Sequence, residues 1–233
     1  MNKVYANVDE AVADIPQGAS VALGGFFTAG SPVWLIKALA KRRVGSLTLI
    51  VQSVGVGNVE VNQLIENLQV KKVIANYPFY RSATAGKQHV FELLVRAGAI
   101  ELEIYPMGTF IEKLRAAGAG IPAFYVAAGV GTGLDENREK RFFNDKVYML
   151  ETALKPDFAL IHAYKGDTHG NLLYRKTARN YNNVMAMAAD VTIAEVEELV
   201  EAGKMDPNLV STPGIYVERV VKVEKPRVAL ATI

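Results

Sequence analysis

The sequence predicts an α/β protein: a mostly parallel sheet with helices on both faces, and extra β elements in the C-terminal half. Short apolar runs of strand length alternate with stretches of about ten to fifteen residues that have helical periodicity. Glycines or other turn residues close most of these runs. No internal repeat or linker divides the 233 residues, so we expect a single domain over residues 1–233.

The first half of the chain supplies the alternation. Asn7 and Glu10 have the spacing of a capping box, and Ser31-Pro32 is expected to open a later helix with Ser31 as its N-cap. The predicted strands are 21–23, 47–52, 72–75 and 100–105, and the predicted helices are 8–15, 32–43, 60–68, 85–97 and 109–117. Ligands of such sheets bind at the carboxyl ends of the strands. Those ends are Gly24-Gly25-Phe26, Gln52-Ser53, Asn76-Tyr77-Pro78 and Pro106-Met107-Gly108.

The second half has a different texture. Residues 134–143 are highly charged and are expected to form an exposed excursion. Residues 167–171 predict a turn between a strand and a short returning hairpin arm. The β candidates here are 146–150, 157–164, 172–174, 184–188, 191–196 and 215–223.

The segment from Gln17 to Pro32 combines a short strand, a glycine turn and a helix start. Backbone N–H groups at a helix start, with the positive end of the dipole, suit a carboxylate, a phosphate or a developing oxyanion. Glycines also let a ligand approach the backbone closely. An ordinary tight turn is the alternative, and the glycine spacing is not that of the dinucleotide fingerprint.

Composition excludes several classes. A net charge of +2 gives no indication of nucleic acid or an anionic membrane surface as a partner. The absence of cysteine excludes a disulfide framework, a thiolate metal site and a cysteine nucleophile. The first residues resemble neither a signal nor a transit peptide, and no apolar run approaches membrane-spanning length. We therefore expect a cytoplasmic protein with no membrane segment.

Candidate catalytic groups are few. Of the three histidines, His89 is expected inside a helix and His162 as a satisfied buried side chain. His169 is expected in a turn, as a candidate for acid–base work. Their spacing does not indicate a metal site, and there is no serine-nucleophile elbow. No carboxylate stands out as a buried nucleophile. Arg175 and Arg179 lie in a polar stretch, residues 165–182, that suits either anion binding or a structural network.

Several motifs together resemble a known family. The motif Leu23-Gly24-Gly25-Phe26-x-x-x-Gly30-x-Pro32 is similar to a signature of the alpha subunit of class I CoA-transferases, the 3-oxoacid type. The resemblance continues in order over nearly the whole chain, through residues 118–124, 129–132, 165–180 and 212–217.

This resemblance implies a CoA-transferase-like fold and transfer of coenzyme A between an acyl-CoA, with succinyl-CoA a candidate, and a small carboxylic or 3-oxo acid. Coenzyme A is then a substrate, and no permanently bound cofactor is expected. In this family a glutamate from the beta subunit, acting as nucleophile, attacks the thioester and later carries CoA as a glutamyl thioester. The motif that contains that glutamate is absent here, so the resemblance implies a catalytic beta partner, in an α2β2 assembly.

The predicted substrate or oxyanion loop comprises Gly24, Gly25, Phe26, Gly30, Gln52, Met107 and Gly108. Met107 stands where the family usually has a glutamine, and a thioether cannot donate a hydrogen bond. The family also has Ser-Asn-Asn or Ser-Asn-Asp after the second strand, where this chain has Gln52-Ser53-Val54. These departures keep open an acyl-CoA hydrolase on the same scaffold, and a non-catalytic subunit that binds CoA esters or organic acids. A related sugar-phosphate isomerase would need an acid–base carboxylate near the glycine loop, which the sequence does not indicate.

Overall fold

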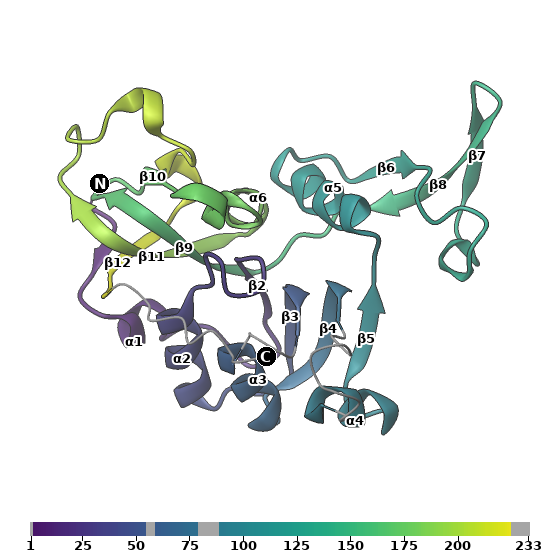
Figure 1. Cartoon of the computed structure of the whole chain (residues 1–233), viewed down its shortest axis with the longest axis horizontal. Helices are drawn as coiled ribbons and strands as arrows, with labels where there is room; N and C mark the ends of the chain where they lie inside the picture. Colours follow the sequence, from purple (N-terminus) through teal and green to yellow (C-terminus); the bar gives the residue numbers. More distant parts are fainter. Residues whose placement is uncertain (1, 55–58, 79–88, 225–233) are drawn as a thin grey trace.

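The computed structural model describes residues 2–54, 59–78 and 89–224. Within these residues the main element is a nine-stranded sheet in the order β1-β12-β11-β9-β2-β3-β4-β5, with β10 paired to β9 (Figure 1). Only the β9–β10 pair is antiparallel, as expected for a hairpin arm. The strands of this nine-stranded sheet are β1 (Val4–Tyr5), β2 (Ser20–Leu23), β3 (Leu47–Ser53), β4 (Val70–Tyr77), β5 (Glu101–Ile104), β9 (Phe158–Asp167), β10 (Leu172–Leu173), β11 (Val191–Val200) and β12 (Arg219–Lys222).

The central strands are apolar on both faces because helices cover both. In β2, Val21 and Leu23 face one core cluster and Ala22 faces the other. The first cluster contains residues of α1 (Val8–Ala11), α2 (Val33–Arg42), α3 (Val59–Glu66) and α4 (Val90–Arg96). The second contains residues of α5 (Met107–Gly118) and α6 (Asn182–Ala188). The predicted parallel sheet with helices on both faces is therefore confirmed.

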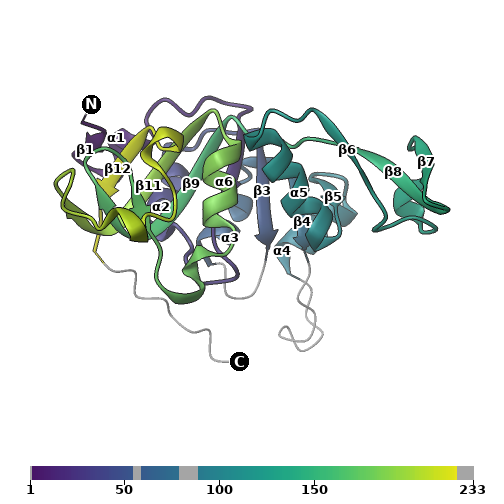
Figure 2. The same cartoon turned by 90° about the horizontal axis from the view of Figure 1, so that it is seen from above.

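A separate three-stranded antiparallel sheet projects from the body as an arm, visible in both views (Figures 1 and 2). Its strands are β6 (Ala123–Val126), β7 (Lys140–Phe143) and β8 (Lys146–Thr152), in the order β6-β8-β7. The predicted exposed excursion is confirmed, but it contains the strand β7 and a 3-10 turn, η2 (Gly133–Asp135). Buried Glu151 of β8 accepts from Lys113 of α5 at 2.9 Å, which joins the arm to the body.

Three local predictions need correction. The stretch 184–188, predicted as β, belongs to helix α6, because a short apolar run has no decisive period and here packs on the sheet. His89 precedes α4 as its N-cap rather than lying inside it, while residues 85–88 of that predicted helix lie outside the described residues. The predicted strand 215–223 is shorter: its first part is the 3-10 turn η5 (Gly214–Tyr216), and β12 follows. Among the described residues the other 3-10 turns are η3 (Lys176–Arg179) and η4 (Pro207–Leu209).

Candidate functional site

The glycine-rich loop, residues 24–32, connects β2 to α2. Phe26 and Ala29 exchange two backbone hydrogen bonds of 3.0 Å, which closes a tight turn. Between them Phe27 has a φ of +50°, a left-handed conformation that is uncommon for a bulky residue. The loop therefore has a defined, strained shape of the kind that often accompanies a functional site.

Two asparagines from the segment before and at the start of α6 hold this loop. Asn182 is fully buried and donates to the carbonyls of Gly30 and Ala178 at 2.9 and 2.8 Å. Its Oδ1 accepts from the backbone N–H of His162 at 3.1 Å. Asn180 donates to the carbonyl of Ala29 at 2.8 Å. The loop is thus tied to β9 and α6 as well as to its own neighbours.

The same contacts explain two of the glycines. A β-carbon on Gly24 would lie 1.9 Å from Asn182 Oδ1, and one on Gly30 would lie 2.7 Å from Asn182 Nδ2. The sequence predicted that glycines here let a ligand approach the backbone. At Gly24 and Gly30 the group that approaches is the chain's own Asn182.

Aromatic side chains and strand ends meet beside the loop. The ring of Phe26 stacks on that of Tyr181, with centroids 6.2 Å apart, and Phe27 lies edge-on to Tyr77 at 6.1 Å. The Tyr181 hydroxyl accepts from Asn76 Nδ2 at 2.7 Å, and burial raises the pKa of that hydroxyl. Gln52 Oε1 accepts from the backbone N–H of Phe27 at 3.3 Å. The ends of β2, β3 and β4 therefore lie together, as the parallel sheet predicted.

The start of α5 borders this edge. Met107 and Gly108 are its first residues and are exposed, while the Phe110 ring lies edge-on to Tyr181 at 5.9 Å. No side chain caps this helix. Two buried polar atoms nearby, Thr109 Oγ1 and Asn76 Oδ1, have no hydrogen-bond partner among the described residues. Unpaired buried polar atoms cost free energy, so they mark a place where a polar ligand group would be stabilised.

We define the strand-end site by Phe26, Gln52, Asn76, Met107 and Tyr181. Of the residues predicted to line a pocket, Phe26 and Gln52 contact the loop or its neighbours here, and Met107 and Gly108 begin the adjoining helix. The sequence reasoning missed Tyr181 and Asn76 as partners. Both lie in stretches that the sequence singles out, but the contact between them joins residues 105 positions apart.

The N-terminus of α2 differs from its prediction. The helix begins at Val33, with Pro32 at the cap position and no side-chain cap from Ser31. Instead, Glu195 Oε2 accepts from the backbone N–H groups of Trp34 and Leu35, both at 2.9 Å. These donors, expected from the sequence to face a ligand, are paired with a carboxyl group of the chain itself.

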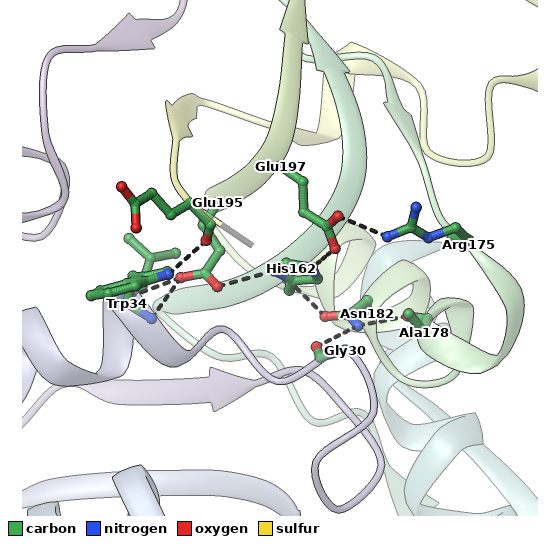
Figure 3. Close-up of polar contacts among 10 residues, drawn as sticks. Gly30, Trp34, His162, Arg175, Ala178, Asn182, Glu195 and Glu197 are labelled. Carbon is green, nitrogen blue, oxygen red and sulfur yellow. Dashed lines mark hydrogen bonds and ion pairs between the residues drawn. The ribbon is translucent and has the colours of Figure 1, made fainter. Parts of the chain in front are cut away.

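Glu195 is also the buried, perturbed carboxyl that the sequence did not reveal. Burial raises its pKa, while hydrogen bonds from His162, Leu35 and Trp34 act in the opposite direction. His162 Nδ1 lies 3.0 Å from Glu195 Oε1 (Figure 3). The prediction of a satisfied buried histidine is confirmed. Because Glu195 is fully buried and both its oxygens are engaged, it does not meet the requirements of an accessible nucleophile.

The polar stretch 165–182 is largely a structural network. Arg175 pairs with Glu197 at 2.8 Å, and Arg179 donates to Ser211 at 3.1 Å. In the described ranges no cluster of three or more His, Asp or Glu side chains is arranged to hold a metal ion. The helices among those same residues include none with the length and apolarity needed to cross a membrane.

Known proteins resemble this chain in both sequence and fold. The sequence pattern of the family described as Coenzyme A transferase matches residues 5–223. The chain is 44% identical over 225 residues to one subunit of the succinyl-CoA:3-ketoacid coenzyme A transferase of Helicobacter pylori strain J99, covering 97% of this chain and 94% of that protein. It is also 44% identical over 223 residues to the corresponding subunit of the 3-oxoadipate CoA-transferase of Pseudomonas putida, covering 96% of this chain and 94% of that protein.

Solved structures agree on the fold. Glutaconate coenzyme A-transferase from Acidaminococcus fermentans matches with a TM-score of 0.81 and 23% identity, over 95% of this chain and 76% of that one. A variant of the decarboxylase AibA/AibB matches with a TM-score of 0.79 and 26% identity, over 96% of this chain and 84% of that one. Proteins named for different reactions therefore share this fold.

The chain belongs to the coenzyme A transferase family, as the motifs predicted. The expectation of a transferase that acts as one subunit of an enzyme is confirmed by relatives that are named as CoA-transferase subunits.

Proposed function

We propose that this chain is the alpha subunit of a two-subunit enzyme that moves coenzyme A from succinyl-CoA to a 3-oxo acid. Relatives named for 3-ketoacid and 3-oxoadipate transfer support this substrate class. The observation in the molecule itself that supports this proposal is the strand-end site. It places loop backbone, a tyrosine–asparagine pair and an uncapped helix start side by side, and the carboxyl described near the loop, Glu195, is inaccessible.

The chemistry proposed for this site runs in two halves. A glutamate supplied by the beta partner attacks the thioester carbonyl. The carbon–sulfur bond then breaks, CoA leaves as a thiolate, and an acyl-glutamyl anhydride remains. The thiolate then attacks the glutamyl carbonyl, which releases the first acid and leaves a glutamyl-CoA thioester. The second acid reverses these steps and takes the CoA. No oxidant or metal is consumed.

Each half passes through a tetrahedral oxyanion, which this chain would help to stabilise. The loop residues Gly24, Gly25, Phe26 and Gly30 would shape the acyl or oxyanion side of the site, and Gln52, Met107 and Gly108 would line the same pocket. The backbone N–H groups of Gly24 and Phe26 are already paired with the carbonyls of Leu160 and Ala29, so the donors come from other positions. Donors aimed at a developing oxyanion commonly contribute a factor of about a hundred to a thousand in rate. The uncapped first turn of α5 offers backbone donors where the Met107 side chain offers none.

The test is a CoA-transfer assay on this chain co-expressed with its beta partner, with succinyl-CoA as donor and a panel of 3-oxo acids as acceptors. Free CoA and new thioester are followed separately. We expect new thioester only when an acceptor is present, and no turnover by the purified chain alone. Turnover by the chain alone would contradict the shared site.

Two other outcomes correspond to the alternative functions. CoA released without any acceptor would indicate an acyl-CoA hydrolase, which the missing side-chain donor at Met107 keeps open. Ligand binding without turnover in the complex would indicate a non-catalytic binding subunit. Size and chain ratio of the co-purified complex, measured by light scattering, test the α2β2 assembly.

A further inference from the structure

Glu195 of β11 closes the N-terminus of α2, the helix into which the glycine-rich loop runs. Its carboxyl oxygen Oε2 pairs with the N–H groups of Trp34 and Leu35, two of the four donors that a helix start leaves without an intrahelical partner. The residue is fully buried, and 160 positions separate it from Leu35 in sequence. A long-range contact therefore replaces the local cap that Ser31 does not supply.

A row of polar groups holds Glu195 in turn (Figure 3). His162 of β9 is its direct neighbour in the strand register and contacts Glu195 Oε1 through Nδ1 at 3.0 Å. The other ring nitrogen of His162 lies 3.4 Å from Glu197, whose second oxygen pairs with Arg175 at 2.8 Å. Glu195 is thus held from both oxygens, by a helix on one side and a histidine on the other.

We propose that Glu195 is a positioning residue that, held by His162, sets the place and orientation of the glycine-rich loop. The inference rests on the role proposed above for that loop in CoA transfer. Asn182 and Asn180 hold the carbonyls of Gly30 and Ala29, while Glu195 holds the first turn of α2 directly after the loop. Releasing the helix start would let the loop move relative to Tyr181 and Asn76. A displacement of about 1 Å in a catalytic constellation can cost about a hundredfold in rate.

The strength with which Glu195 holds the start of α2 depends on whether its carboxyl is protonated. The ionisable groups around the carboxyl are His162 from β9, Glu197 on its own strand, and Arg175 beyond Glu197. Lys37 of α2 lies over the Trp34 ring, and the first turn of this helix has no acidic residue. The residue of β12 that is paired with Glu195 in the strand register is the apolar Val221. An ionised carboxyl accepts the helix N–H groups more strongly than a protonated one. Protonation of Glu195 should therefore loosen the start of α2, and burial, which raises its pKa, brings that event closer to neutral pH.

Trp34 is the single tryptophan of the sequence and donates its backbone N–H to Glu195, so its fluorescence reports on this contact. The experiment compares the purified full chain with the Glu195→Gln and Glu195→Leu variants between pH of about 7.5 and 4.5. Glu198→Gln is the matched control, because this carboxyl is on the same strand but pairs with Tyr164 and Lys165. We expect a pH-dependent change in Trp34 emission in the wild type and in Glu198→Gln, and none in Glu195→Gln.

The second measurement uses the complex with the beta partner. Glu195→Leu should lower kcat by about a hundredfold with a much smaller change in KM, because it leaves two helix donors unpaired and the loop displaced. Glu195→Gln keeps an acceptor oxygen, so its kcat should lie between those of Glu195→Leu and the wild type. It should also lose the decline in kcat that protonation of Glu195 causes on acidification.

The proposal is overturned if Trp34 emission titrates in Glu195→Gln as it does in the wild type, or if that variant keeps both the kcat and the pH profile of the wild type. The Gln variant preserves shape, so this decision does not depend on whether Glu195→Leu folds. Failure of the wild-type complex to transfer CoA would contradict the proposed function instead. The Trp34 titration would then still decide whether Glu195 controls the start of α2.

Discussion

The side-chain oxygen of Asn182 lies where residue 24 has no room for a β-carbon: the two positions would be 1.9 Å apart. The glycine-rich loop and helix α6 therefore fit together only because residue 24 is a glycine. Asn182 uses that closeness to accept from His162 and to donate to Gly30, so one buried amide joins β9, α6 and the loop.

The first prediction follows from this contact. Gly24→Ala should lower the free energy of unfolding by about 1–3 kcal/mol, the usual cost of an overpacked interior. The measurement is the urea denaturation midpoint. Gly45→Ala is the control: a β-carbon there meets no atom within 4 Å and φ is not positive, so its stability should change little or rise slightly.

A double-mutant cycle identifies the cause. In an Asn182→Ala background the cost of Gly24→Ala should shrink, because the clashing oxygen is gone. An equal cost of Gly24→Ala with and without Asn182 would show that the contact is not responsible.

The second prediction concerns stability and pH. Burial raises the pKa of Glu195 above its ordinary value of 4.5, so the folded chain binds this proton more tightly than the unfolded chain. The stabilisation that the folded chain gains from binding this proton is fully present below pH 4.5. It is lost as the pH rises through the folded-state pKa. Relative to Glu195→Gln, which cannot titrate, the wild type should lose free energy of unfolding as the pH rises. The measurement is urea denaturation of both proteins at a series of pH values. A wild type that instead gains stability relative to Glu195→Gln with rising pH would contradict the raised pKa.

The third prediction concerns the anchor of the arm. Glu151 is 1% exposed and pairs with Lys113, which is 3% exposed, and with Arg138 at 2.8 Å. Glu151→Ala leaves a buried lysine unpaired and should lower the free energy of unfolding by about 3–5 kcal/mol. Lys155→Ala breaks the exposed pair with Asp190 and should cost less than about 1 kcal/mol. Similar denaturant midpoints for the two variants would contradict the prediction.

The fourth prediction concerns the start of α5. Met107→Gln adds an amide donor at an exposed position beside the strand-end site. If the proposed oxyanion role is correct, kcat for CoA transfer should rise, because one added donor can contribute about a hundredfold or more. Met107→Leu, which has similar volume and no donor, should leave kcat near the wild-type value. A Gln variant no faster than the Leu variant would place the oxyanion elsewhere.

The sequence by itself determined the parallel α/β core and the family. Both rest on local signals: the alternation of strand and helix periods between Val21 and Gly118, and ordered motifs such as Gly24 to Pro32. Strand-end residues could also be grouped in advance, because carboxyl ends of parallel strands share one edge, and Phe26, Gln52 and Asn76 do lie there.

Only the tertiary structure decided what each of those residues touches. The cap of α2 comes from Glu195 rather than from adjacent Ser31, and Asn182 takes the space that the sequence assigned to a ligand at Gly24. Stretch 184–188 forms helix α6 for the same reason: packing on the sheet overrode an ambiguous local pattern. Propensity and capping signals reach a few residues along the chain. Hydrogen bonds and burial act between residues that only the completed fold brings within contact distance.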